Sequence, residues 1–323
     1  MNINYRNDNT IFFTVARMNP PTPGHLYVIS ELIKEALNKN IDHVYVILSK
    51  TNDNNENPIP CSEKINILGA DKTTIDSMTY SLIREMISEV QNDTNISDVE
   101  KEEKIQKLNN MNVISICVPD VPRATPFTVI GQLIYSLKNV QDINLFVVIG
   151  DDRGDIVDSI ADIYFYKKDN VVSIDKKILG RSNMGTYKNL SPEQLATIDI
   201  KSMPVGSSFS GSFVRKLVKY DLKDKFNEIY TRYLDQTKID ELYNSIKNGL
   251  ELPVNKKRET APKPIKYTYP LIKDVVNDED EERVSKKQRI SGGKKTKKQI
   301  KRKTRKYNKN KKTKKYLKRR YRH

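Results

Sequence analysis

The chain has 323 residues, which is enough for one large domain or two modest ones. Its residues are 37% hydrophobic and 30% charged, and a mean hydropathy of -0.65 indicates that part of the chain is too polar for a core. Residues 283–323 contain 22 Lys and Arg and no Asp or Glu, so the net charge of +16 leaves residues 1–282 at −6. The body is therefore mildly acidic, and the tail alone is basic.

The same composition argues against several classes of protein. The longest apolar runs are strand-sized, far short of the roughly 20 residues that cross a bilayer, and residues 1–10 lack the apolar run of a signal peptide. Two cysteines, Cys61 and Cys117, cannot form a disulfide framework and favour an intracellular, reducing compartment. Three histidines argue against a His/Cys metal cage, whereas carboxylates could still hold Mg²⁺.

Strands and helices are expected to alternate over the first 222 residues. Apolar segments predict strands at 11–16, 43–48, 112–118 and 144–149, with a fifth at 163–166 or 171–174. Helical spacing follows the first strand, extends over about 62–108 with a break near 92–95, and returns between the third and fourth strands at Ile130, Leu133, Ile134 and Leu137. This order predicts an α/β fold: a Rossmann-like parallel sheet covered by helices on both faces, with ligands bound beyond the carboxyl ends of the strands.

Three regions are expected along the chain. Residues 1–222 form the Rossmann-like domain with a helical insertion at about 62–110, and residues 223–252 form a short helical extension. From residue 253 onward, prolines, an acidic cluster at 278–282 and the basic run show no periodicity, which predicts a disordered tail.

The first chemical motif is Arg-Met-Asn-Pro-Pro-Thr-Pro-Gly-His at residues 17–25, between the first strand and the first helix. A proline-rich turn explains the prolines but not Gly24, because a glycine that opens a helix costs stability unless something approaches its backbone closely. His25 would stand on the first helical turn, among exposed N–H groups at the positive end of the helix dipole. The motif therefore predicts a phosphate site.

The second motif is Ser-Phe-Ser-Gly-Ser-Phe-Val-Arg at residues 208–215. Its simplest interpretation is a serine cap for a helix at 213–220, a role that Ser210 could fill alone. However, Ser210, Gly211 and Ser212 also offer hydroxyls and N–H groups at a helix start, and Arg215 adds a guanidinium one turn inside. That combination is suited to holding phosphates.

The two motifs together resemble the signatures of the nucleotidyltransferase superfamily. The segment from Thr22 to His25 resembles the signature Thr/His-x-Gly-His, and the longer motif is similar to the nicotinamide-nucleotide adenylyltransferase branch and to cytidylyltransferase-like proteins of phages and large DNA viruses. The second motif resembles Ile-Ser-x-Thr-x-x-Arg, with Phe209 for Ile and Ser212 for Thr. The order and the separation of the motifs also match.

Two further segments resemble parts of the same family. Gly150-Asp-Asp-Arg153 follows the fourth strand and is similar to a Gly-Ser-Asp-Arg segment that lines the nucleotide pocket, with Asp151 in place of Ser. A polar turn capped by Asp152 is the alternative.

Residues 57–64 resemble an Asn-Pro-x-x-x-x-Glu-Lys element of the phage-type relatives, near the acceptor side. The alternative is a loop and a helix capped by Ser62, with Lys64 in solvent. Arg123 follows the third strand and could reach the same cleft.

The resemblance covers about residues 10–222 and implies transfer of AMP from ATP to a phosphorylated small molecule such as nicotinamide mononucleotide, with release of pyrophosphate. Mg²⁺ would bridge the triphosphate oxygens, and no metal ligands are assigned to the chain. The catalytic residues would be His25, Ser212 and Arg215. The nucleotide would contact Arg17, Asn19, Thr22, Gly24, Gly150, Asp152, Arg153, Ser210 and Gly211. The acceptor would contact Lys64 and Arg123.

Two alternatives remain. A cytidylyltransferase would use CTP, but that branch usually carries Arg-Thr-x-Gly-Ile-Ser-Thr-Thr, and residues 205–212 lack the Arg-Thr opening. The body could instead be an inactive relative in a nucleic-acid-binding protein, for which Thr22, Asp151 and the basic tail leave room. The high content of Asn, Lys and Ile resembles that of proteins from large DNA viruses. Such an origin would place the chain in the cytoplasm or nucleus of a host cell. Residues 286–289 could act as a nuclear import signal.

The tail is expected to tether nucleic acid or another polyanion, rather than only to solubilise the chain. Deleting residues 284–323 should abolish retention of DNA or RNA at low salt, because lysines bind phosphates without reading bases and release counterions. Nucleotidyl transfer should be nearly unchanged, since every candidate catalytic residue precedes Lys216. Filter binding across a salt series measures the first effect, and equally tight binding by the truncated chain would show the tether to be wrong.

Overall fold

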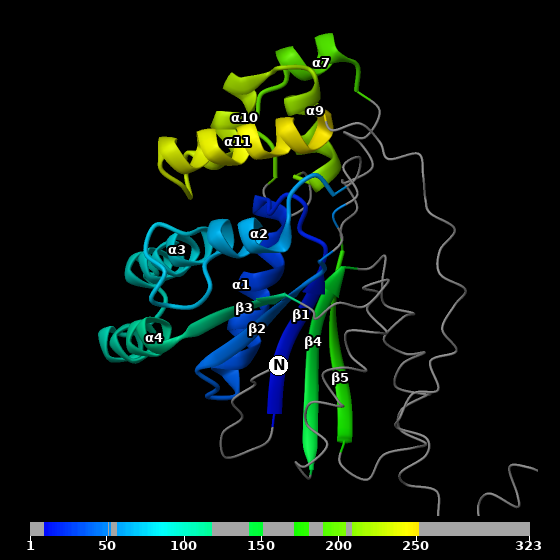
Figure 1. The fold of residues 1–323 in the computed structure, drawn as a ribbon. Helices are drawn as coiled ribbons and strands as arrows, with labels where there is room; N and C mark the ends of the chain where they lie inside the picture. Colours follow the sequence, from blue (N-terminus) through cyan, green and yellow to red (C-terminus); the bar gives the residue numbers. More distant parts are fainter. Residues whose placement is uncertain are drawn as a thin grey trace, which may run out of the picture. The chain divides into compact units, whose positions relative to one another are not determined.

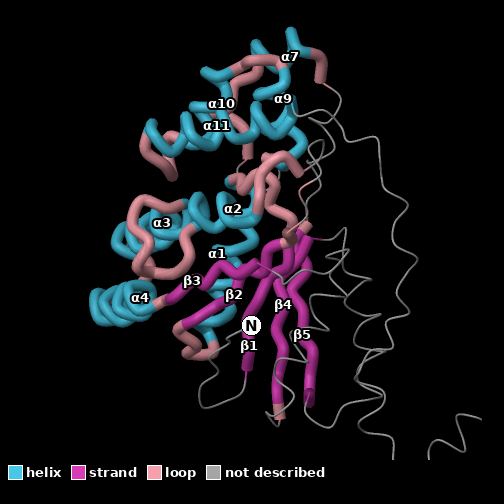
Figure 2. The backbone as a smooth tube through the Cα atoms, viewed as in Figure 1, coloured by secondary structure: helices cyan, strands magenta, loops and turns pink. Residues whose placement is uncertain are grey.

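The computed structural model describes residues 10–50, 52, 57–117, 142–150, 171–180, 190–204 and 209–251. They belong to one compact unit, Met1–Val254, whereas the second unit, Asn255–His323, lies outside the described residues together with the predicted basic tail. Figure 1 shows the course of the chain, and Figure 2 separates its helices from its strands.

Five parallel strands form one sheet in the order β3-β2-β1-β4-β5. They are β1 (Thr10–Ala16), β2 (His43–Leu48), β3 (Asn112–Cys117), β4 (Ile143–Gly150) and β5 (Val171–Leu179). With its helices, the sheet is an α/β, Rossmann-like fold. The sequence located four strands to within a residue or two at each end, because β2 is buried at every position and β1 at most positions.

The fifth strand occupies the second of its two predicted positions, and it continues five residues farther than expected, to Leu179. Its C-terminal half contains Asp175, Lys176 and Lys177, which interrupt the apolar pattern. Charged side chains are common in such a position, because β5 is the last strand of the described sheet. The other predicted position, residues 163–166, lies outside the described residues, as does the helix expected at 130–137.

The predicted helix at 62–108 is three helices: α2 (Cys61–Leu68), α3 (Met78–Asn92) and α4 (Asp98–Asn110). The break near 92–95 agrees with the prediction, but the break after Leu68 was missed. Gly69 has a φ of 102°, a conformation that favours glycine, and a Cβ there would lie 2.6 Å from Ser77 Oγ. The chain therefore turns away from α2 at this residue.

The remaining described helices are α1 (Pro23–Asn38), α7 (Pro192–Thr197), α9 (Gly211–Lys219), α10 (Lys223–Tyr230) and α11 (Gln236–Glu251). The predicted extension is thus two helices rather than one, and the short α7 was not predicted. Among these residues, no helix is long and apolar enough to cross a membrane.

One hydrophobic core joins the sheet to the C-terminal helices. The apolar face of α1, including Ile29 and Leu32, packs in the same cluster as Phe213 of α9 and Phe226 and Tyr230 of α10. In Figure 1, α9, α10 and α11 lie beyond the carboxyl ends of the strands. The core thus supports these helices at the edge of the sheet where a Rossmann-like fold binds ligands.

An ion cluster of Lys177, Glu31, Glu35 and Lys34 links β5 to α1. Lys177 Nζ lies 2.8 Å from both Glu31 Oε2 and Glu35 Oε1. Burial raises the pKa of Glu31, but hydrogen bonds from Lys177 and Lys34 outweigh it and hold that pKa below its ordinary value. Hydrogen bonds to the two glutamates raise the pKa of Lys177.

Replacing Lys177 by Met should lower the free energy of unfolding by about 1 kcal/mol at neutral pH, since the pair is only partly buried. A lowered Glu31 pKa stabilises the fold above the ordinary value of 4.5, and this contribution is lost as the pH falls through the folded-state pKa. Urea unfolding should therefore show the difference from the wild type shrinking from about pH 7 to about pH 3. Lys72→Met, at an exposed position, is the control, and an equal loss in both variants would contradict the ion cluster.

Candidate functional site

The strand order of the sheet reverses between β1 and β4, because successive strands are added on one side of β1 and then on the other. The chain runs from β1 toward β2 and β3 on one side, while β4 and β5 lie on the other. The paired register of β1 and β4 ends at Phe13 and Val147, three residues before Ala16 and Gly150 end the two strands. Such a crevice is the usual ligand site of a doubly wound sheet. Gly150, a predicted nucleotide contact, lies at this place and is buried.

The first turn of α1 lies directly against the segment that precedes α9. Thr22 Oγ1 donates a hydrogen bond of 2.7 Å to the carbonyl oxygen of Phe209, which is 187 residues away in the chain. A Cβ built on Gly24 would lie 2.7 Å from the same oxygen. The glycine that the sequence singled out is therefore required by a close approach of backbone.

The start of α9 lies in turn against the loop after β1. A Cβ on Gly211 would lie 3.0 Å from the carbonyl oxygen of Asn19, and the Arg215 guanidinium donates a hydrogen bond to that oxygen. The two motifs found in the sequence thus meet in space, and the N-termini of two helices converge at the carboxyl end of β1.

Polar side chains lie at both helix starts. Ser210 caps α9, because its Oγ accepts from the Phe213 N–H at 3.1 Å and lies 3.0 Å from the Oγ of the exposed Ser212. The partly exposed ring of His25 lies in the first turn of α1, where Nδ1 is 2.8 Å from Thr22 Oγ1 and 3.1 Å from the Thr22 amide nitrogen. Hydroxyls, an imidazole and a guanidinium at two helix N-termini can bind a polyanion.

The loop between β1 and α1 is held by contacts that the sequence did not indicate. The buried Asn19 side chain donates to Ile59 O at 2.8 Å and accepts from Ile59 N at 3.1 Å. Tyr230 donates to Pro21 O at 2.6 Å, and burial raises the pKa of this phenol. The sequence predicts nucleotide contacts for Asn19 and Thr22, whereas in the structure both side chains are buried against protein atoms. Arg17, in the same motif, is exposed.

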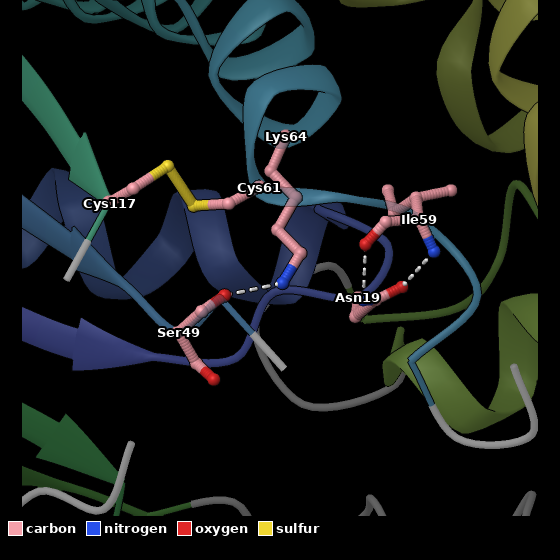
Figure 3. The surroundings of a disulfide bond; sticks show 6 residues. All are labelled: Asn19, Ser49, Ile59, Cys61, Lys64 and Cys117. Carbon is pink, nitrogen blue, oxygen red and sulfur yellow. Dashed lines mark hydrogen bonds between the residues drawn. A yellow bond between two sulfur atoms is a disulfide. The ribbon is translucent and has the colours of Figure 1, made fainter. Parts of the chain in front are cut away.

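Lys64 is buried rather than solvated. Its side chain is fully inaccessible, and Nζ donates a 2.7 Å hydrogen bond to the carbonyl oxygen of Ser49, just after β2 (Figure 3). The alternative of a solvated lysine is therefore wrong. The helix begins at Cys61, one residue before the predicted start at 62, and its N-cap is Pro60 rather than Ser62. An acceptor contact by Lys64 stays a prediction.

Cys61 and Cys117 form a disulfide, which their number in the sequence did not predict. The bond links the first residue of α2 to the last residue of β3, next to the Lys64–Ser49 and Asn19–Ile59 contacts (Figure 3). These three links hold residues 57–64 against the carboxyl ends of β1, β2 and β3.

The remaining predicted site residues, Asp152, Arg153 and Arg123, lie outside the described residues. Within the described part, no group of three or more His, Cys, Asp and Glu side chains is placed to hold a metal ion. The supporting role of Tyr230 left no local signal in the sequence, because its partner Pro21 is 209 residues away.

No family model and no curated protein matches this chain. Among solved structures, nicotinic acid mononucleotide adenylyltransferase from Plasmodium falciparum in complex with NaAD is similar, at 14% sequence identity and a TM-score of 0.37. The same enzyme in complex with APC gives 13% identity and a TM-score of 0.34. In both cases the match covers 73% of this chain and 98% of that chain.

The contact between the two motifs predicts that a methyl group added at different glycines destabilises the fold to different degrees. Gly24→Ala should lower the free energy of unfolding by about 1–3 kcal/mol, because its Cβ would collide with a backbone carbonyl, and Gly211→Ala should cost less. Gly180→Ala is the matched control, since no atom lies within 4 Å of a Cβ there. Urea unfolding of the three variants measures the order, and equal stability of Gly24→Ala and Gly180→Ala would contradict the close approach.

Proposed function

We propose that this chain is a nucleotidyltransferase that transfers AMP from ATP to a phosphorylated small molecule and releases pyrophosphate. The observation that carries the proposal is the convergence of the His25 turn with the Ser210–Arg215 turn at the carboxyl end of β1. Two adjacent helix N-termini, with a guanidinium and hydroxyls beside them, suit a triphosphate better than a singly charged ligand. The resemblance of both motifs to the nucleotidyltransferase signatures supports the same reaction.

Each side chain has a distinct role in this proposal. Ser210 and Ser212 hold the β- and γ-phosphates with hydroxyls and the α9 N–H groups, and His25 binds the phosphates from α1. Arg215 neutralises the pyrophosphate as it leaves. Its hydrogen bond to Asn19 O uses one of five guanidinium N–H donors and orients the group.

The reaction needs no covalent enzyme intermediate. An oxygen of the acceptor phosphate forms a bond to the α-phosphorus in line with the leaving group. The bond from that phosphorus to the oxygen that bridges the α- and β-phosphates breaks, and pyrophosphate leaves with the electron pair. Catalysis comes from positioning the two substrates and from stabilising the charge that develops on the leaving oxygens.

Magnesium enters this proposal as part of the nucleotide substrate. In this proposal the oxygens of the triphosphate hold the ion, and the ion offsets part of the negative charge of the triphosphate. Residues 57–64, fastened beside the strand ends by three links, are the proposed acceptor side.

Binding of Mg²⁺–ATP measured by calorimetry tests the nucleotide site. His25→Ala and Arg215→Ala should each weaken binding at least about tenfold, because each removes a charge-assisted contact with phosphate. Lys219→Ala removes an exposed cation from the far end of α9 and is the matched control. Thermal unfolding of each variant confirms that the fold is kept. Unchanged affinity in both site variants would exclude this site.

Pyrophosphate release tests the reaction and separates ATP from CTP. The full chain is incubated with either nucleotide and a panel of phosphorylated acceptors that begins with nicotinamide mononucleotide and nicotinic acid mononucleotide. Release with ATP and one acceptor is expected, and release with CTP alone would favour the cytidylyltransferase alternative. If no pair of nucleotide and acceptor releases pyrophosphate, the proposed nucleotidyltransferase activity is contradicted, and the inactive nucleic-acid-binding alternative is favoured.

A further inference from the structure

One side of α11 is fixed to the helix that carries the second motif. The Tyr243 hydroxyl and Lys247 Nζ both donate to Asp221 Oδ1, at 2.7 Å and 3.2 Å. Asp221 lies two residues beyond the end of α9, and α11 also packs directly against α9 and α10. Side chains four residues apart share one side of a helix, so these contacts define a first side of α11.

The opposite side of α11 contacts the segment proposed as the acceptor side. Ser245 Oγ donates a hydrogen bond to the Glu63 carboxylate of α2, and the two helices lie side by side (Figure 1). A Cβ built on Gly249 would lie 2.7 Å from the carbonyl carbon of Pro58 and closer still to its oxygen. Ser245 and Gly249 are also four residues apart. Each stands two residues, or about 200° of helix rotation, from the residues that bind Asp221.

The same part of the chain also holds the helical insertion farther along. Ser81 of α3 donates through Oγ to the carbonyl oxygen of Tyr233 at 2.8 Å, and Lys238 Nζ donates to Asp76 O at 2.6 Å. Residues 233–249 thus follow the insertion from α3 to the loop before α2. This line of contacts indicates that α11 has a fixed place relative to both of its neighbours.

The contacts from α11 complement the three links that hold residues 57–64 to the sheet. Those links fix Ile59, Cys61 and Lys64, whereas α11 reaches Pro58 and Glu63 between and beside them. The sheet therefore holds this segment from one direction, and the C-terminal helices hold it from another.

We propose that α11 is a spacer that sets the distance between the two substrates, and that Ser245 and Gly249 are positioning residues for the acceptor. The nucleotide side comes from α9, and the acceptor side comes from residues 57–64. In-line attack needs the acceptor oxygen within about 3–3.5 Å of the α-phosphorus, so a small shift of one side against the other slows the reaction. This role in the reaction rests on the proposed function, whereas the ordering of residues 57–64 by α11 concerns the free chain alone.

Steady-state kinetics tests the role of Ser245. The substrates are Mg²⁺–ATP and nicotinamide mononucleotide or, if only that acceptor releases pyrophosphate, nicotinic acid mononucleotide. Ser245→Ala should lower kcat/KM for the acceptor about tenfold, because it removes a hydrogen bond to a charged group of the acceptor side. The affinity for Mg²⁺–ATP, measured by calorimetry, should stay within about twofold of the wild type.

Two further variants separate this role from a general loss of stability. Ser245→Thr keeps the hydroxyl and should restore kcat/KM, and Asn244→Ala, at the exposed neighbouring position, should leave it unchanged. A purely structural effect would reduce the amount of folded protein and so affect both substrates alike. An unchanged kcat/KM for the acceptor in Ser245→Ala, or an equal loss of ATP affinity, would overturn the proposal.

Gly249→Ala tests the second contact. The added methyl group collides with the Pro58 backbone, so kcat/KM for the acceptor should fall at least as far as in Ser245→Ala, and Asn248→Ala at the next, exposed position is the control. Thermal unfolding shows whether the fold is kept. If Gly249→Ala does not fold, Ser245→Ala decides the question, because it adds no atoms.

Hydrogen exchange of the free chain needs no substrate and distinguishes the two proposals. In Ser245→Ala the amides of residues 57–64 should exchange up to about tenfold faster than in the wild type, while those of β1 should not change. If no nucleotide and acceptor react in the wild type, the proposed function fails, and this exchange alone decides whether α11 orders the segment. Unchanged exchange in residues 57–64 would show that it does not.

Discussion

The carbonyl group of Phe209 lies against the first turn of α1, and the candidate site depends on that contact. Thr22 donates to it, and Gly24 leaves the space that lets it approach. Because α9 begins two residues later, the same contact sets where Ser210, Ser212 and Arg215 lie relative to His25. Two helix N-termini, whose partial positive charges repel each other, are held together here by contacts among backbone and hydroxyl groups. A polyanion between them would relieve that repulsion.

The loop between β1 and α1 is fixed from several directions before any ligand arrives. Ile59 binds the Asn19 side chain, Arg215 binds the Asn19 carbonyl, and Tyr230 binds Pro21. Tyr230 belongs to a helix in the extension, and its ring lies in the core that the extension shares with the sheet. The C-terminal helices therefore contribute directly to the geometry of the site. A site assembled in this way has already met the entropy cost of ordering its loop.

The outline of the sheet could be predicted because its inner strands are apolar on both faces, which few structures other than a covered parallel sheet allow. The prediction was weakest where charged side chains or backbone conformation, rather than apolar burial, determine the structure. The C-terminal half of β5 carries charges such as Lys177, which binds Glu31 and Glu35 on α1. This half therefore lacks the apolar pattern that predicts a strand. The break after α2 depends on the positive φ of Gly69 and the closeness of Ser77, and neither is visible as a change in hydropathy.

The sequence by itself determined the Rossmann-like class, the order of the strands along the chain and the two polar turns, because periodicity and turn chemistry are local properties. It also placed those turns at a strand end and a helix start. The tertiary structure alone decided what each side chain contacts. Asn19 and Lys64 were expected near ligands or solvent, yet Asn19 binds Ile59 and Lys64 binds Ser49 inside the protein. Both partners are backbone groups that nearly every residue type presents, so no pattern of side chains could reveal them. Only the folding of distant segments against each other could bring them together.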